Sequence, residues 1–156
     1  MNLDKFNIQI LQALQENAHL TIQELSERVG LSPTPCARRV KQLEEDGIIK
    51  RYVALVDGPK IGLGLTAFIH VRLRTQSKKA VDAFEAAIRN MSEIMTCHLV
   101  TGNYDYLLML RVESVDACRK FIRDRLIIID SVGETETSIS LEETKLTTAL
   151  PLPGWR

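Results

Sequence analysis

The chain has few of the residues that build disulfide frameworks or metal sites. Its three cysteines, Cys36, Cys97 and Cys118, are an odd number, lie far apart in the sequence and form no CxxC pair. Its three histidines have no partner at the spacing of metal ligands. Disulfide-rich domains and zinc sites need cysteines or histidines in sets. We therefore expect free thiols in a reducing compartment, with no metal and no cofactor.

Long hydrophobic runs are also absent. No apolar stretch approaches the about 18–20 residues that cross a bilayer. The first residues, MNLDKFNIQI, lack the basic stretch and apolar core of a signal peptide. Apolar residues make up 45% of the chain and charged residues 26%, as in ordinary soluble domains. The sequence therefore predicts a cytoplasmic protein without a membrane partner.

The chain has no excess of charge of either sign. Its 20 lysines and arginines balance 20 aspartates and glutamates, which gives a formal net charge of zero. Indiscriminate binding of polyanions is therefore disfavoured, because it rests on a basic excess. Between Ser32 and Lys41, however, the charged residues are all cations, Arg38, Arg39 and Lys41. A local basic patch on a neutral protein suits a dimer that adds two weak contacts with DNA half-sites.

The first part of the chain has the pattern of short helices. Apolar residues recur at helical spacing over residues 3–15, which predicts a first helix. Thr21 and Glu24 have the spacing of a capping box at the start of a second helix. Gly30 is placed to end that helix in the left-handed conformation. Two helices are therefore expected before residue 30.

A third helix follows after a short turn. Ser32 is a good N-cap, and Pro33 at the first helical position loses no hydrogen bond. At about 100° per residue, one face of this helix is buried and the opposite face is polar. The buried face is predicted to contain Pro33, Cys36, Ala37, Val40 and Leu43, and the outer face Thr34, Arg38, Gln42 and Glu45. Two helices joined by a tight turn, the second with cations outside, form a helix-turn-helix that binds the major groove of DNA. A basic strand at residues 48–56 follows this unit, which we expect to be of the winged type.

The rest of the chain alternates strands with helices. In chain order, the expected elements are a strand at 66–74, a helix at 78–91, strands at 93–101 and 104–112, a helix at 115–129 and a strand at 134–142. This βαββαβ order is that of a ferredoxin-like domain. The break at residues 57–59, Asp-Gly-Pro, separates the two parts. We expect an α+β protein with a helix-turn-helix domain at 1–60 and a ferredoxin-like domain at 61–156.

The predicted strands are apolar on both faces. Ile69 alternates with Phe68, and Leu108 alternates with Leu107. A sheet with one face in water normally alternates apolar with polar residues. Burial of the second face, at roughly 25 cal/mol per Å² of apolar area, favours a homodimer through this domain.

Three motifs appear in a fixed order along the chain. They are VGLSPTPC at residues 29–36, continued by Arg39-Val40 and Leu43-Glu44, then HLVTGNYDYLL at 98–108, and VGETETSISLEE at 132–143. Because of these three motifs, the chain from Leu3 to about Glu143 resembles the Lrp/AsnC family of feast/famine transcription regulators, which sense amino acids. The resemblance implies dimers that assemble further, often to octamers. It also implies an amino acid such as leucine or methionine as the effector, bound between dimers.

The candidate contacts with double-stranded operator DNA lie on and around the helix-turn-helix. Arg38 points directly away from the buried stripe, where a base edge or a phosphate lies in such complexes. Hydroxyls near the start of the third helix are suited to phosphates. Taken alone, these residues are equally a solvated helix face. The expected DNA-binding set is Thr21, Gln23, Ser32, Thr34, Pro35, Arg38, Arg39, Lys41, Lys50 and Arg51.

The resemblance places an effector loop at residues 102–105. Taken alone, this Gly-Asn segment is an ordinary hairpin turn. By the resemblance, amides near Gly102 donate to the effector's carboxylate and Asp105 accepts from its ammonium group. Asn103 stands where many members have an acid. Ile127 and a strand at 135–140 complete the pocket across the dimer–dimer contact. The expected effector-binding set is Thr101, Gly102, Asn103, Tyr104, Asp105, Ile127, Thr135, Thr137, Ser138 and Ser140.

Three functions compete on this basis. The leading hypothesis is a sequence-specific DNA-binding transcription regulator that responds to an amino acid. The alternative is an effector-independent architectural DNA-binding protein, which the neutral net charge disfavours. An amino-acid-binding enzyme is the third, but the sequence has no nucleophile–base pair, glycine-rich phosphate loop or paired buried carboxylates. We therefore expect no enzyme and no catalytic residues.

Overall fold

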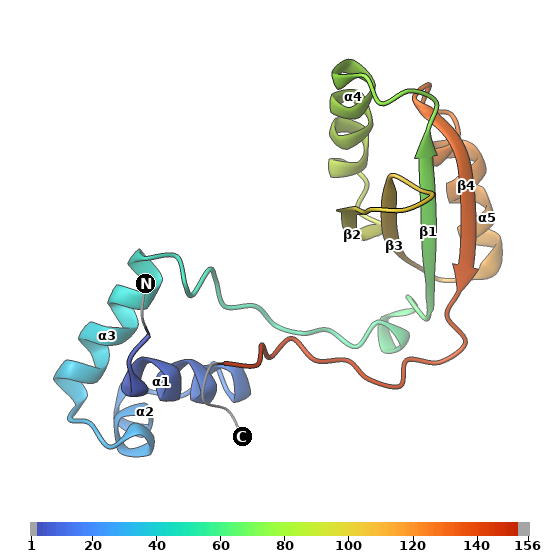
Figure 1. Ribbon diagram of the computed structural model, residues 1–156. Helices are drawn as coiled ribbons and strands as arrows, with labels where there is room; N and C mark the ends of the chain where they lie inside the picture. The colour runs from blue at the N-terminus through green and yellow to red at the C-terminus, as the bar shows by residue number, and fades with distance from the viewer. Residues whose placement is uncertain (1–2, 153–156) are drawn as a thin grey trace. The chain divides into compact units, whose positions relative to one another are not determined.

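The computed structural model describes residues 3–152, which form two compact units (Figure 1). The first unit contains the chain up to Leu55 together with the C-terminal segment from Lys145. The second contains Val56–Thr144. We predicted domains at residues 1–60 and 61–156, so the C-terminal segment was expected in the second domain. It belongs instead to the first unit.

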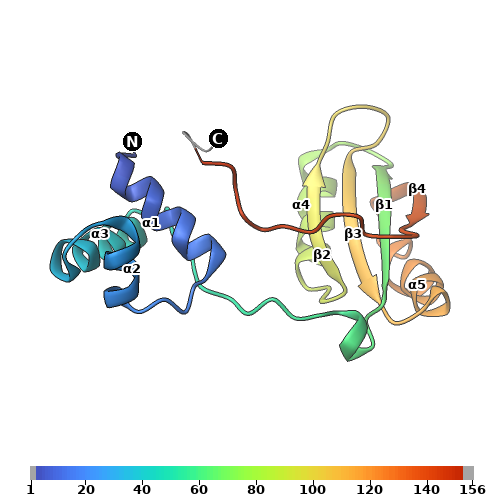
Figure 2. The ribbon, with the colours of Figure 1, turned by 90° about the horizontal axis from the view of Figure 1, so that it is seen from below.

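Three helices form the first unit, as Figure 2 shows: α1 (Lys5–Glu16), α2 (Ile22–Val29) and α3 (Pro33–Glu45). They enclose one apolar core, whose buried side chains are Ile10, Leu11, Ala13, Leu25, Val29, Cys36, Val40 and Leu43. All three predicted helices are present, and the inward positions predicted for α3 at Cys36, Val40 and Leu43 are confirmed. Pro33, which the same pattern places inward, is exposed at the first turn.

Both predicted ends of α2 are confirmed. The Glu24 amide donates to Thr21 Oγ1 at 3.2 Å, and the Thr21 amide donates to Glu24 Oε2 at 2.7 Å, which completes the capping box. Gly30 follows with φ 70°. Because glycine has no Cβ, it adopts this left-handed conformation at little cost and turns the chain sharply into α3.

The predicted strand at residues 48–56 has no strand partner among the described residues. Ile48 and Ile49 pack against the core of the first unit. Tyr52 then donates a 2.9 Å hydrogen bond to Glu44 of α3. A strand requires a hydrogen-bonded neighbour, and a single chain supplies none for this segment.

The second unit is a four-stranded antiparallel sheet in the order β2-β3-β1-β4. Its strands are β1 (Leu65–Leu73), β2 (Ile94–Leu99), β3 (Tyr106–Val112) and β4 (Val132–Ile139). A short 3₁₀ turn, η1 (Pro59–Ile61), precedes β1, α4 (Lys78–Arg89) joins β1 to β2, and α5 (Val115–Phe121) lies between β3 and β4. This order confirms the ferredoxin-like domain and the α+β class.

The helix predicted at 115–129 is shorter and less regular than expected. After α5 the chain widens into a π-helical turn, η2 (Ile122–Leu126), in which the Ile127 amide donates to the Ile122 carbonyl at 2.9 Å. This turn ends the helical segment three residues before the predicted end, because residues 127–131 form turns instead. π-helical turns are uncommon and often occur near functional sites.

The two helices cover one face of the sheet, and residues on β3 alternate between fully and partly buried. The covered face contributes Ile69, Leu108 and Leu110, all with no exposed surface. Phe68 on the opposite, open face is 38% exposed. The core of the second unit therefore lies between the sheet and its helices, and the open face keeps apolar side chains at its surface.

The C-terminal segment returns to α1. Gln15 holds the backbone of Leu150 from both sides, since its Oε1 accepts from the Leu150 amide at 2.6 Å and its Nε2 donates to the Leu150 carbonyl at 3.2 Å. Leu152 packs against the core of the first unit. The chain thus begins and ends its described part in the same unit. No helix among residues 3–152 is both long and apolar enough to cross a bilayer.

Candidate DNA-binding surface and effector loop

The helix-turn-helix presents α3 with its polar side outward. Thr34, Arg38, Lys41 and Gln42 are all exposed. Within the described chain Arg38 has no ion-pair partner, whereas Lys41 lies 3.5 Å from Glu45 in an exposed pair. Exposed pairs of this kind are weak. Arg38 and Lys41 are thus free to contact DNA, as predicted from helical spacing, although the contact itself stays a prediction.

Arg39 differs from its neighbours because it turns toward α1. Its Nη1 donates to Asp4 Oδ2 at 2.7 Å and to Asn7 Oδ1 at 2.8 Å, and its guanidinium lies 5.5 Å from the centre of the Phe6 ring. The side chain is 28% exposed. Arg39 therefore fastens α3 to α1, and both N–H groups of its Nη1 are already used within the unit.

The start of α3 is less able to bind phosphate than predicted. Ser32 occupies the N-cap position, but its side chain makes no capping hydrogen bond. An N-cap oxygen accepts from the second or third helical amide, and the third position here is Pro35, which has no N–H. The first position is Pro33, so Thr34 alone offers a free amide. The hydroxyls of Ser32 and Thr34 are exposed and remain the candidate phosphate contacts.

The candidates on α2 are engaged in local contacts. Thr21 forms the capping box with Glu24, and Gln23 donates to Glu27 at 2.6 Å. Lys50 and Arg51 are exposed and directly precede Tyr52, which is bonded to Glu44 of α3. Burial, followed by this bond, raises the pKa of Tyr52 to about 12, so its hydroxyl stays a donor at neutral pH. The contact keeps the two cations beside the C-terminal part of α3.

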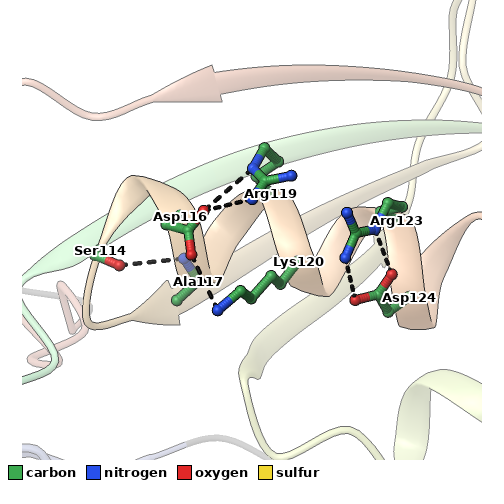
Figure 3. A network of polar contacts seen from close by, with 7 residues as sticks. All are labelled: Ser114, Asp116, Ala117, Arg119, Lys120, Arg123 and Asp124. Carbon is green, nitrogen blue, oxygen red and sulfur yellow. Dashed lines mark hydrogen bonds and ion pairs between the residues drawn. The ribbon is translucent and has the colours of Figure 1, made fainter.

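A second basic helix, α5, does not offer comparable free charge. On α5, Arg119 and Lys120 lie 2.6 and 3.1 Å from the oxygens of Asp116, and on the following turn η2 Arg123 lies 2.5 Å from Asp124 (Figure 3). Each of these cations lies within 3.1 Å of a carboxylate oxygen, closer than Lys41 lies to Glu45 at 3.5 Å, whereas Arg38 has no such neighbour among the described residues. The free basic patch is therefore a property of α3 and not of every helix with arginines.

The loop at residues 101–105, which contains the effector loop predicted at 102–105, lies between β2 and β3. Gly102 has φ 118°, which favours glycine. The carboxylate of Asp105 fastens the loop to the end of β1: Oδ2 accepts from the Leu73 amide and Oδ1 from Gln76 Nε2, both at 2.7 Å. Asp105 therefore holds the loop in place. Its bond to an effector's ammonium group stays a prediction, and that bond would use the same two carboxylate oxygens.

The remaining effector candidates do not converge within one chain. Thr135 and Thr137 pair with Val71 and Ile69 of β1, on the helix-covered side of the sheet. Ser138 pairs with Phe68 on the open side. Ser140 donates its amide to Thr66, at the end of β1 away from the loop. Ile127 is 47% exposed beyond η2. A common pocket for all of these residues therefore needs more than one copy of the chain.

The residues that hold the loop were not predicted. Arg72 donates to the Asn103 carbonyl at 2.7 Å, and Gln76 reaches Asp105. Both lie about thirty positions before the loop in sequence, separated from it by a helix and a strand. The sequence around Arg72 and Gln76 shows only polar residues near the end of a strand, and nothing in it indicates a contact with a loop about thirty positions later.

A hollow of about 390 Å³ lies at the start of α5, away from the loop, and is lined by charged residues including Glu93, Arg111, Asp116, Lys120 and Asp124. Among the described residues, Arg125 pairs with Glu93 and Arg111 with Glu143, in addition to the pairs within α5. Most of the charges around it are therefore paired, although Glu113 in its lining has no ion pair among the described residues, and the hollow contains none of the predicted effector residues.

Two family models match the chain. The model described as the Lrp/AsnC ligand binding domain covers residues 66–150, and a winged helix-turn-helix DNA-binding model covers residues 3–50. The leucine-responsive regulatory protein of Salmonella typhimurium is 39% identical over 144 residues, which make up 92% of this chain and 88% of that protein. The corresponding protein of Escherichia coli K12 is 38% identical over the same lengths.

Solved structures give the same result. A transcriptional regulator of Neisseria meningitidis, solved in complex with L-methionine, has a TM-score of 0.94 and 46% identity, with 97% of this chain and 98% of that chain covered. AsnC of Escherichia coli has a TM-score of 0.87 and 27% identity, with 95% and 98% covered. With a ligand-domain model over more than half of its length and such relatives over nearly all of it, this chain belongs to the Lrp/AsnC family of DNA-binding transcription regulators.

Proposed function

We propose that the chain binds operator DNA through α3, with Arg38 as the principal contact to base edges. The supporting observation is the free guanidinium of Arg38 beside the engaged guanidinium of Arg39. Lys41, Lys50 and Arg51 add contacts to the phosphate backbone, together with the hydroxyls of Ser32 and Thr34. The neutral net charge limits nonspecific affinity, so selective binding depends on several copies that act on adjacent half-sites.

The effector is an amino acid with an apolar side chain, and L-methionine is the first choice. The regulator of Neisseria meningitidis was solved with L-methionine, and the Salmonella relative is named as leucine-responsive. Amides of the loop at 101–105 donate to the carboxylate of this amino acid. Ile127 and the β4 residues of a second dimer complete its pocket. This agrees with the position of Ser140, which lies at the end of the sheet away from the loop of its own chain.

The active form is an assembly in the cytoplasm, where its DNA partner lies. Two chains pair through the open faces of their sheets, where Phe68, Leu107 and Met109 offer apolar surface. The dimers then assemble further, to an octamer. An effector bound between dimers shifts the response only if it binds one state of assembly better than another.

Titration of labelled upstream DNA with the full chain, with and without each amino acid, tests this function. We expect retarded complexes whose affinity or stoichiometry changes with L-methionine or L-leucine. Absence of any complex at low salt contradicts the DNA-binding assignment. Complexes that respond to no amino acid contradict the effector assignment and support the architectural alternative.

A further inference from the structure

Arg72 lies at the centre of the contacts around the effector loop. Its Nε donates a 2.7 Å hydrogen bond to the Asn103 carbonyl, and its Nη1 lies 3.0 Å from Glu134 Oε2. Its guanidinium also lies over the Tyr104 ring, 5.2 Å from the ring centre. One side chain on β1 thus joins the loop on one side to β4 on the other.

Folding stability does not account for this arrangement. The side chains of Arg72 and Glu134 are 47% and 55% exposed, and ion pairs between exposed groups add little to stability. Tyr104 in turn donates a 2.8 Å hydrogen bond to Glu136, also at the surface. Three exposed contacts that converge on two adjacent loop residues restrict the conformation of the loop, and that restriction is their main physical effect.

Peptide geometry lets Arg72 orient an amide. The peptide bond between Asn103 and Tyr104 is trans, as are all those described, so its C=O and N–H point in opposite directions. Because the Asn103 carbonyl faces Arg72, the Tyr104 N–H points away from the guanidinium. Within residues 3–152 no group accepts a hydrogen bond from this N–H. It is therefore a donor available to an anion.

We propose that Arg72 is a positioning residue for the effector's carboxylate. By holding the Asn103 carbonyl, it fixes the Tyr104 amide as a donor for that carboxylate, a role that rests on the proposed amino-acid effector. If this peptide turned over, a carbonyl oxygen would replace the amide and repel the anion. The ligand class is thus an α-amino acid with a free carboxylate, and derivatives without that charge gain less from Arg72, because a hydrogen bond to a neutral carbonyl is weaker than one to a carboxylate.

Two substitutions separate the parts of this arrangement. Arg72→Lys keeps the positive charge near Glu134 but loses the planar fork that reaches Asn103 and Glu134 together. Glu134→Gln weakens the ion pair and leaves the bond to Asn103 intact. Arg119→Lys is the matched control, since Arg119 is an exposed arginine paired with Asp116 on α5. Melting temperatures of all variants, which we expect to stay near that of the native chain, verify folding.

Calorimetric titration of the full chain with L-methionine and with L-methioninamide measures the effect. We expect Arg72→Lys to weaken methionine binding by roughly five- to tenfold, as for the loss of one hydrogen bond, and to change methioninamide binding much less. Glu134→Gln and Arg119→Lys should bind methionine almost as the native chain does.

Three results overturn the inference. One is methionine binding by Arg72→Lys at native affinity, and another is an equal loss for methionine and methioninamide, which indicates a general structural role. The third is an equal loss in Glu134→Gln. If the native chain itself binds no L-methionine, the methionine assignment fails first, so the two failures are distinguishable.

Discussion

At the scale of single residues, adjacent arginines on α3 have different roles. Successive residues on a helix are about 100° apart, so Arg38 points to solvent while Arg39 reaches Asp4 and Asn7 on α1. Both arginines contribute the same positive charge to the net charge of the chain. Their partners distinguish a residue that is free to bind from one that maintains the fold.

Alanine substitutions at these two positions should separate DNA binding from stability. Arg38→Ala should weaken operator binding by about 1–3 kcal/mol, the value of a good contact with a base, and leave the melting temperature unchanged. Arg39→Ala should lower the free energy of unfolding by about 1 kcal/mol, because Asp4 and Asn7 lose their partner. Anisotropy titrations and thermal melts measure the two effects. Equal loss of stability in both variants would contradict this division.

The carboxyl group of Asp4 gives the first unit a dependence on pH. The Asn7 amide, followed by Arg39, holds the pKa of Asp4 below its usual range, and the bonds from Thr21 do the same for the pKa of Glu24. Because the pKa of each carboxyl is lower in the folded state, its ionised form stabilises the fold. This stabilisation is fully present when the pH is above the pKa in the unfolded state, about 4. It is lost as the pH falls through the lower pKa of the folded state. Stability should therefore decline below about pH 4.5.

Asp4→Asn tests that dependence. Asparagine remains a good N-cap but has no charge, so the variant should melt lower than the native chain at pH 7 and lose less stability on acidification. Thermal melts between pH 7 and pH 3 measure both slopes. Parallel curves for the two proteins would show that Asp4 does not contribute to the acid response.

At the scale of secondary structure elements, the two helices of the DNA-binding motif begin in different ways. α2 has a complete capping box, whereas in α3 Pro35 removes the amide of the third position and the Ser32 side chain does not cap the remaining amide of Thr34. Proline also fixes its own φ near the helical value, so α3 begins without side-chain capping. The Ser32 hydroxyl therefore makes no capping hydrogen bond.

Removal of the two hydroxyls should therefore have different consequences. Thr21→Ala should destabilise the first unit by about 1 kcal/mol, as loss of an N-cap usually does. Ser32→Ala should leave stability nearly unchanged but weaken DNA binding, if the hydroxyl contacts a phosphate. Urea unfolding measures the first effect and operator binding the second. A loss of stability on Ser32→Ala similar to that on Thr21→Ala would refute the distinction.

At the scale of the whole molecule, the open face of the sheet is the surface through which we propose that two chains pair. Phe68 is 38% exposed, and Leu107 and Met109 are only partly buried by their own chain. Burial of this surface against a second copy removes apolar area from water. The same pairing brings two copies of α3 into one particle, which suits the modest local charge of each.

A charge on this face should prevent pairing. Met109→Glu places a carboxylate among apolar side chains at the centre of the open face, so dimers should dissociate, since an unpaired buried charge is costly. Sedimentation velocity measures the change, and circular dichroism confirms folding. Val115→Glu, at a position 59% exposed on α5, is the matched control and should remain assembled. Dimers of Met109→Glu at native affinity would exclude the open face as the interface.

Sequence pattern alone determined the three helices of the first unit, the βαββαβ order of the second unit and both ends of α2. Hydrophobic periodicity and end signals such as Thr21, Glu24 and Gly30 are local, and each acts within a few residues. Helix α3 and its outward Arg38 were predictable for the same reason. The family motifs then located the candidate effector loop at residues 102–105.

Only the tertiary structure decided which polar side chains remain free. Arg39 bonds to residues more than thirty positions away, Asp105 bonds to Leu73 and Gln76, and Gln15 bonds to Leu150. These pairs form because folding brings distant segments together, and no local pattern encodes them. The strand predicted at 48–56 is missing for a related reason, since a strand needs a hydrogen-bonded neighbour and the rest of the described chain supplies none.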